Sequence, residues 1–114
     1  MIVEFYKTEK GKKPAGDFIK SIEDVKLRAK VVRSLKLLET YGTELREPDS
    51  KPLGDGIFEL RTIQGDNIAR CLYFFFVGDK AIVTNGFIKK QQKTPPEETD
   101  LAKKYKADYE RRNK

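Results

Sequence analysis

Three cations lie where the sequence has the clearest potential for chemistry. Arg61 and Arg70 interrupt the apolar runs IFELRTI and NIARCLYFFFVG, and Lys89 opens the segment KKQQK, which ends at Lys93. Guanidinium and ammonium groups bind phosphate and stabilise negative charge that develops in a transition state. A lysine crowded by other cations can also have its pKa lowered enough to act as a base or an acid near neutral pH. These residues therefore form a candidate anion site.

The residue types that the sequence lacks exclude several other chemistries. There is no histidine, which removes histidine-based triads, histidine metal sites and the usual general base at neutral pH. The single cysteine, Cys71, lies in an apolar run and gives neither a disulfide framework nor a thiolate cluster for zinc. The carboxylates are too scattered to suggest a metal pair, and GDGIFE lacks the ending of a phosphate-binding P-loop. We therefore expect neither a metal nor a cofactor.

The overall charge favours a polyanionic partner such as nucleic acid. Lys and Arg total 24 against 18 Asp and Glu, which gives a net charge of +6 and a pI near 9.4. Ordinary solubility charge remains the alternative on composition alone. No apolar stretch approaches the roughly 20 residues that span a bilayer, and the opening MIVEFYKTEK has no signal-peptide core. We expect a cytoplasmic protein with no membrane segment.

The N-terminal half is predicted to be mainly helical. Residues 2–7 alternate apolar and polar side chains, which predicts a short strand at an edge or opening of a sheet. Pro14 suits the first turn of one helix, and a second helix begins around residues 21–24 and stops at Gly42. The Pro, Gly, Asp and Glu content of residues 43–56 indicates a surface loop.

The C-terminal half is predicted to form three adjacent antiparallel strands and a helix. The strands are Ile57–Ile63, Asn67–Gly78 and Lys80–Lys90, with hairpin turns between them. Thr94 is predicted to cap the helix, with Glu97 completing a capping box. Residues 1–114 then form one small α+β domain with an antiparallel β-sheet, two N-terminal helices and a C-terminal helix.

Strand alternation predicts which of the cations share a face of this sheet. Glu59 and Arg61 lie on one face of their strand, and Phe87 and Lys89 share a face of the last strand. If the strands are neighbours, Arg61, Arg70 and Lys89 can converge on one solvated patch. The alternative is that Arg61 merely pairs with Glu59 as a surface ion pair.

Three motifs in order carry a resemblance to a known family. They are GDGIFELR at residues 54–61, IARCLYFF at 68–75 and GFIKKQQKTP at 86–95, followed by a C-terminal helix. This arrangement resembles the HigB-like branch of the RelE toxin superfamily, often described as phage-derived toxin-like proteins, over essentially the whole chain. Phe58 stands where the family commonly has tryptophan, and Thr84 and Asn85 replace a more usual Leu-His pair.

The resemblance implies a RelE-like fold and the toxin of a type II toxin–antitoxin pair. Such toxins are metal-independent endoribonucleases that cleave mRNA on the translating ribosome. The substrate 2′-hydroxyl attacks the adjacent phosphate and leaves a 2′,3′-cyclic phosphate, so that the protein supplies positioning and charge. The implied partners are the ribosome, mRNA and a cognate antitoxin, plausibly with a helix-turn-helix DNA-binding domain, in a toxin–antitoxin hetero-oligomer.

The resemblance also assigns roles to individual residues. Arg61 and Arg70 would clamp the scissile phosphate, and Lys89 would contact that phosphate or transfer a proton. Arg70 and Lys89 are both expected on a solvated face. The predicted RNA-binding residues are Lys51, Tyr73, Phe87, Lys90 and Lys93. The lysines would bind flanking phosphates or ribosomal RNA, and the two aromatic residues could stack on a base, although each also suits a core.

Two alternatives from other classes stay open at the level of sequence. The same superfamily includes ParE-like toxins, which bind DNA gyrase and are not nucleases, so fold alone does not decide function. A catalytically silent RNA-binding or antitoxin-binding module is the third reading. The combination of Arg61, Arg70 and Lys89 with KKQQK favours RNA chemistry.

Overall fold

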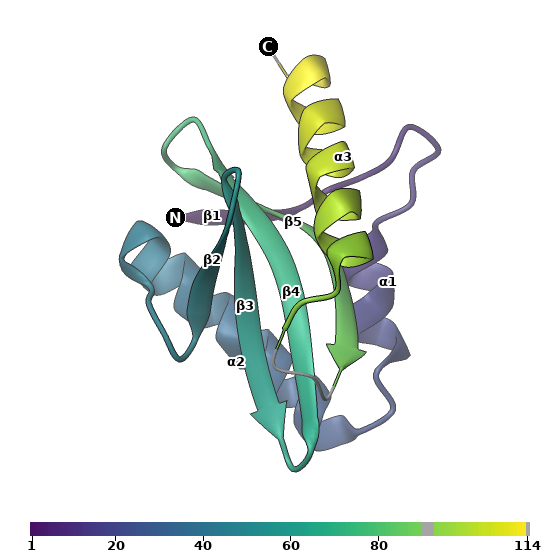
Figure 1. Ribbon diagram of the computed structural model, residues 1–114, viewed down its shortest axis with the longest axis vertical. Coiled ribbons are helices and arrows are strands. Elements are labelled where there is room, and N and C mark those ends of the chain that lie inside the picture. The colour runs from purple at the N-terminus through teal and green to yellow at the C-terminus, as the bar shows by residue number, and fades with distance from the viewer. Residues whose placement is uncertain (90–92, 114) are drawn as a thin grey trace.

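The computed structural model describes residues 1–89 and 93–113 (Figure 1). The elements of this part of the chain are β1 (Ile2–Phe5), α1 (Pro14–Ser21), α2 (Val25–Tyr41), a 3₁₀ turn η1 (Gly42–Glu44), β2 (Ser50–Gly54), β3 (Ile57–Gln64), β4 (Asn67–Phe76), β5 (Lys80–Lys89) and α3 (Pro96–Arg112). Helices and strands are segregated along the chain rather than alternating. The predicted α+β class, with two N-terminal helices and a C-terminal helix, is confirmed.

The described strands form one five-stranded sheet in the order β1-β5-β4-β3-β2. The predicted hairpin strands β3, β4 and β5 are adjacent and antiparallel, and β1 is an edge strand as predicted. The sheet is mostly antiparallel, and the exception is β1, whose direction the sequence did not predict and which runs parallel to β5, with Ile2 opposite Lys80. Strands joined by a hairpin must be antiparallel, whereas β1 and β5 are far apart in sequence and no turn fixes their direction.

The segment predicted as a surface loop, residues 43–56, contains an additional strand. Ser50–Gly54 forms β2, which pairs with β3 at the other edge of the sheet and has a register shift between Pro52 and Gly54. Proline has no N–H for the ladder, and it is tolerated here because an edge strand has only one neighbour. The Pro and Gly residues that suggested a loop therefore mark a bulged edge strand.

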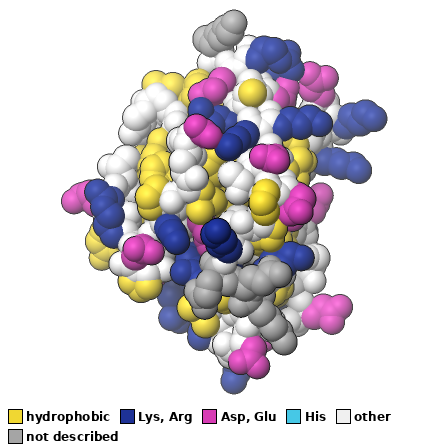
Figure 2. Space-filling model, viewed as in Figure 1, with side chains coloured by type: hydrophobic (Ala, Val, Ile, Leu, Met, Phe, Trp, Pro, Cys, Tyr) yellow, Lys and Arg dark blue, Asp and Glu magenta, His cyan; other side chains and the backbone are white. Residues whose placement is uncertain are grey.

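The helices cover opposite faces of the sheet. In Figure 1, α1 and α2 lie behind the strands and α3 crosses in front of them. Figure 2, viewed from the same side, shows Lys and Arg side chains among hydrophobic surface on the α3 side of the molecule. No helix of the described residues is long and apolar enough to cross a membrane.

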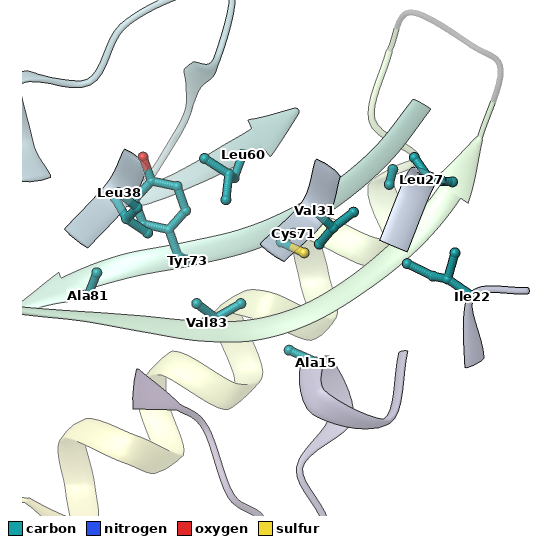
Figure 3. Packing of buried hydrophobic residues seen from close by; sticks show 11 residues of the cluster. Ala15, Ile22, Leu27, Val31, Leu38, Leu60, Cys71, Tyr73, Ala81 and Val83 are labelled. Carbon is teal, nitrogen blue, oxygen red and sulfur yellow. The ribbon is translucent and has the colours of Figure 1, made fainter. Parts of the chain in front are cut away.

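A hydrophobic core fills the space between the sheet and α1 and α2. The α2 residues Leu27, Val31 and Leu38 are buried there at steps of four and seven residues, against Cys71 and Tyr73 of β4 (Figure 3). The helix begins where the Asp24 carboxylate accepts hydrogen bonds from the backbone N–H groups of residues 26 and 27. It ends at Gly42, as predicted, where φ is 52°.

A second core lies between the sheet and α3. Ala102 and Tyr109 of α3 are buried in this cluster together with Leu72 and Phe74 of β4. The C-terminal end of α3 is fastened through Asp108, which accepts a hydrogen bond from the Tyr6 hydroxyl. That bond, helped by the guanidinium of Arg112, lowers the pKa of Asp108 to about 2.

The N-terminal end of α3 differs from the prediction. The helix begins at Pro96, and no side chain caps it, since Pro95 occupies the N-cap position. The hydroxyl of Thr94 instead donates to Oε2 of Glu59 on β3, at 2.7 Å. The predicted capping box is therefore wrong, because the helix begins one residue later than predicted and Thr94 lies before the N-cap position.

Gly86 of β5 lets α1 pack closely on the sheet, and this makes a testable prediction. A Cβ atom at this position would overlap the ring of Phe18 on α1. Gly86→Ala should therefore lower the free energy of unfolding by about 1–3 kcal/mol, the usual cost of overpacking a core. Urea denaturation of the purified protein measures this change.

Gly16 provides the matched control for that substitution. A Cβ atom there would lie 3.5 Å from Cδ2 of Phe5, which is ordinary van der Waals contact. Because alanine is the better helix former, Gly16→Ala should leave the protein as stable as before or up to about 1 kcal/mol more stable. Equal effects of the two substitutions would contradict the packing assigned to Gly86.

Candidate functional site: a buried arginine pair beside a lysine-lined groove

The two strand arginines lie directly opposite each other. Arg61 of β3 pairs with Arg70 of β4, and Arg70 in turn pairs with Phe87 of β5. Phe87 belongs to the core beneath α3, so this row of side chains lies on the α3 face of the sheet. Like charges opposite each other in a ladder destabilise a sheet unless a negative group compensates them.

Glu59 supplies the compensating charge. It lies two residues before Arg61 and so on the same face of β3, and it is 2% exposed. Its Oε1 atom lies 3.1 Å from Nε of Arg70 and 3.3 Å from Nε of Arg61. The ion pair between Arg61 and Glu59 that the sequence left as an alternative is thus present, but it is buried and shared with a second arginine.

Arg70 is fully buried, with 0% of its surface exposed. The prediction that it lies on a solvated face is wrong, because its side chain is enclosed beside the buried Glu59 and Phe87. Burial lowers the pKa of Arg70, the nearby Glu59 carboxylate opposes that change, and the charge of Arg61 adds to it. An arginine remains protonated in a protein, so the site holds two adjacent guanidinium cations.

The predicted lysines lie around this cluster. Lys89 ends β5 and is exposed, and it follows Phe87 by two residues on the α3 face, opposite Ile68 of β4. The expectation that Arg61, Arg70 and Lys89 share one face is therefore confirmed. Lys90 lies outside the described residues, together with the two glutamines of KKQQK.

A groove of about 700 Å³ runs between β2 and the start of α3. Lys51 of β2, which pairs with Glu59 in the sheet, and Lys93 both line it and are both exposed. Glu59 and Thr94 also line this groove, so its wall reaches the buried ion-pair cluster. An anionic chain lying in the groove would meet lysines beside the arginine pair.

The two aromatic residues predicted to stack on a base are buried. Tyr73 is 1% exposed and lies on the opposite face of the sheet, near Leu38 of α2 (Figure 3), where its hydroxyl shares a hydrogen bond with Ser50. Its predicted RNA contact is wrong, since the fold turns it away from the arginines. Phe87 lies on the arginine face but is only 7% exposed, so its ring belongs to the core beneath α3.

The sequence did not single out Glu59 and Thr94 as site residues. A glutamate at an alternating position within the apolar run IFELRTI was the available signal for Glu59. For Thr94, its position three residues before Glu97 predicts only a helix cap. Among residues 1–89 and 93–113, no group of three or more His, Cys, Asp or Glu residues could hold a metal ion.

Fold and site together define a small α+β protein with a cationic site on the α3 face of its sheet. Residues 17–107 match the family described as "Phage derived protein Gp49-like (DUF891)", and this match covers most of the chain. The chain therefore belongs to the Gp49-like phage-derived family, which is toxin-like and part of the RelE/HigB-like toxin group. A search of the curated proteins gives no match.

Burial of Arg70 predicts a large structural effect for its removal. Arg70→Ala would leave Glu59 buried with one of its two guanidinium partners missing, and breaking a buried ion pair typically costs about 3–5 kcal/mol. Chemical denaturation should show a loss of this size. Lys36→Ala, which removes a charge from an exposed position of α2, should change stability by less than about 0.5 kcal/mol. Equal stability of the two variants would contradict the buried cluster.

Proposed function

We propose that this chain is the toxin of a type II toxin–antitoxin pair and an endoribonuclease that cleaves mRNA on the translating ribosome. The observation that carries the proposal is the pair of guanidinium groups of Arg61 and Arg70, adjacent on one sheet face beside a lysine-lined groove. Membership of a toxin-like family supports the toxin assignment. Concentrated positive charge suits a phosphodiester substrate.

The proposed reaction uses the nucleophile of the RNA itself. The 2′-hydroxyl attacks the neighbouring phosphorus, the bond to the 5′-oxygen breaks, and a 2′,3′-cyclic phosphate remains. Extra negative charge develops on the phosphorane oxygens, and guanidinium groups held in place stabilise it. The protein therefore contributes geometry and charge rather than a nucleophile of its own.

The arginines differ in access to the substrate. The Arg61 side chain is 17% exposed and that of Arg70 is 0% exposed. Arg61 is accordingly the guanidinium that the scissile phosphate would contact directly, and the buried Arg70 would add its positive charge from the adjacent strand β4. Lys89, exposed on the same face, is placed to contact the phosphate or to transfer a proton.

The RNA on either side of the cleaved bond would lie in the groove lined by Lys51 and Lys93. Lys51 and Lys93 would contact phosphates on either side of the cleaved bond, and Lys90 is proposed for the same role from its place in KKQQK. Such contacts bind RNA without reading its sequence. The ribosome would supply the mRNA in an extended, accessible form.

Charge removal at Arg61, which is partly exposed, and at Lys89, which is exposed, tests the enzyme assignment. Arg61→Ala and Lys89→Ala should each slow cleavage of ribosome-bound mRNA by on the order of a hundredfold or more, because each removes a contact made to the developing charge. The measurement is mapping of mRNA ends after incubation with translating ribosomes. Lys36→Ala on α2 serves as the control and should cleave like the unaltered protein.

Two outcomes would contradict parts of this assignment. Near wild-type rates in both site variants would show that the proposed active site is wrong. Absence of cleavage by the unaltered protein, combined with inhibition of DNA gyrase, would establish the ParE-like alternative instead. Treating the protein with a chelator before it meets ribosomes kept in magnesium should leave cleavage intact.

An antitoxin is the proposed protein partner, and it makes a separate prediction. A small reading frame beside this gene should encode a protein with a helix-turn-helix DNA-binding domain that forms a hetero-oligomer with this chain. Co-expression should relieve growth arrest and give a stable complex on size-exclusion chromatography. A genome in which no neighbouring small protein binds the chain would count against the toxin proposal.

A further inference from the structure

We infer that Glu59 is the positioning residue of the site. Its carboxylate sets the orientation of both arginines and links them to the segment that precedes α3. The catalytic consequence of this inference rests on the proposed function, whereas its structural consequence does not. Glu59 is a buried carboxylate to which the proposed reaction assigns no step. Every described contact of its side chain leads to another part of the site.

The geometry of the ion pairs fixes the guanidinium planes. Both arginines approach Oε1 of Glu59 through Nε, at 3.1 Å and 3.3 Å. A guanidinium group is planar and carries one N–H on Nε and four on its two Nη atoms. Holding Nε against a fixed carboxylate therefore sets the direction in which the Nη end of each group points. This contact orients two groups that would otherwise repel each other across the β3–β4 ladder.

The charges of the cluster match those of a phosphodiester. Two guanidinium cations and one carboxylate leave one excess positive charge at the site. A phosphodiester carries one negative charge and would neutralise the cluster completely. A second carboxylate would cancel that attraction, whereas removal of Glu59 would leave the buried Arg70 and the partly buried Arg61 without their shared anion.

The second oxygen of Glu59 extends the cluster to α3. Oε2 accepts the hydrogen bond from Thr94, and Thr94 follows Lys93 at the wall of the groove. The same carboxylate thus joins β3, β4 and the chain leading into α3. Since Oε1 lies against the two guanidinium groups and Oε2 accepts from Thr94, Glu59 acts through the arginines and Thr94 rather than on the RNA.

Glu59→Gln tests the structural part without any RNA. The amide keeps the shape and an oxygen acceptor but removes the charge. The Nε–H signals of Arg61 and Arg70 in ¹⁵N NMR should be distinct and protected in the unaltered protein and should shift and lose protection in the variant. Inorganic phosphate at constant ionic strength should raise the Tm of the variant more than that of the unaltered protein, because the anion replaces the lost carboxylate.

Glu23→Gln is the matched control, since Glu23 is exposed on the connection between α1 and α2. This variant should match the unaltered protein in NMR signals and in its response to phosphate. Unchanged Nε–H signals in Glu59→Gln, with a phosphate response equal to that of Glu23→Gln, would overturn the inference.

Single-turnover cleavage of ribosome-bound mRNA tests the catalytic part. Glu59→Gln should lower the maximal rate by on the order of a hundredfold. The protein concentration that gives half the maximal rate should stay equal or fall, because the variant has gained net positive charge. A maximal rate equal to that of the unaltered protein would overturn the positioning role.

Thr94→Val keeps the test decisive if Glu59→Gln does not fold. Valine preserves shape and leaves all charges in place, while Oε2 of Glu59 loses its donor. The maximal rate should then fall roughly fivefold to tenfold, as expected for one hydrogen bond, and the arginine Nε–H signals should lose protection. No change in either measurement would overturn the inference. If the unaltered protein does not cleave mRNA, the proposed function fails, and the NMR and phosphate measurements still decide the role of Glu59.

Discussion

The structure around the site depends on one constraint, which is that the buried carboxylate of Glu59 must be surrounded by groups that compensate its charge. Moving a carboxylate out of water costs several kcal/mol, and attraction to nearby cations offsets this only when the geometry is good. Here Arg61, Arg70 and Thr94 supply that geometry from β3, β4 and the chain before α3. The strand register and the path of the chain into α3 must therefore be correct together for the charges to be compensated.

This requirement divides the sheet into two different faces. On the α1 and α2 side, the core consists of apolar side chains together with hydroxyl groups that bond one another, such as those of Ser34 and Thr62. On the α3 side, apolar residues such as Leu72 and Phe74 lie under the helix, and the arginine row lies further along the same strands toward the start of α3. One helix thus closes a core with its body and borders a charged site with its first turn. The lysine-lined groove lies at the boundary between these two regions.

Local patterns were sufficient for most of the fold and for part of the site. Alternation and turn residues identified β3, β4 and β5, and the same alternation correctly placed Arg61 and Lys89 on one face. The direction of β1 and the existence of β2 depend on pairing between distant segments, which a local pattern does not encode. Alternation also shows which side chains share a face but not what covers that face, and for this reason Arg70 is expected in solvent. Alternation itself places Tyr73, three residues after Arg70, on the face away from the arginines.

Thr94 shows the same limit at the scale of a single hydrogen bond. A threonine three residues before a glutamate predicts a capping box, because the nearby backbone N–H groups need an acceptor. In the folded chain its hydroxyl donates to a buried carboxylate, and a bond to a charged group is roughly twice as strong as one between neutral groups. This bond is made from a position one residue ahead of the N-cap, which Pro95 occupies, and α3 begins without a side-chain cap. A residue whose sequence pattern indicates only helix capping thus becomes part of the site, since its hydroxyl donates to the buried carboxylate of Glu59 on β3.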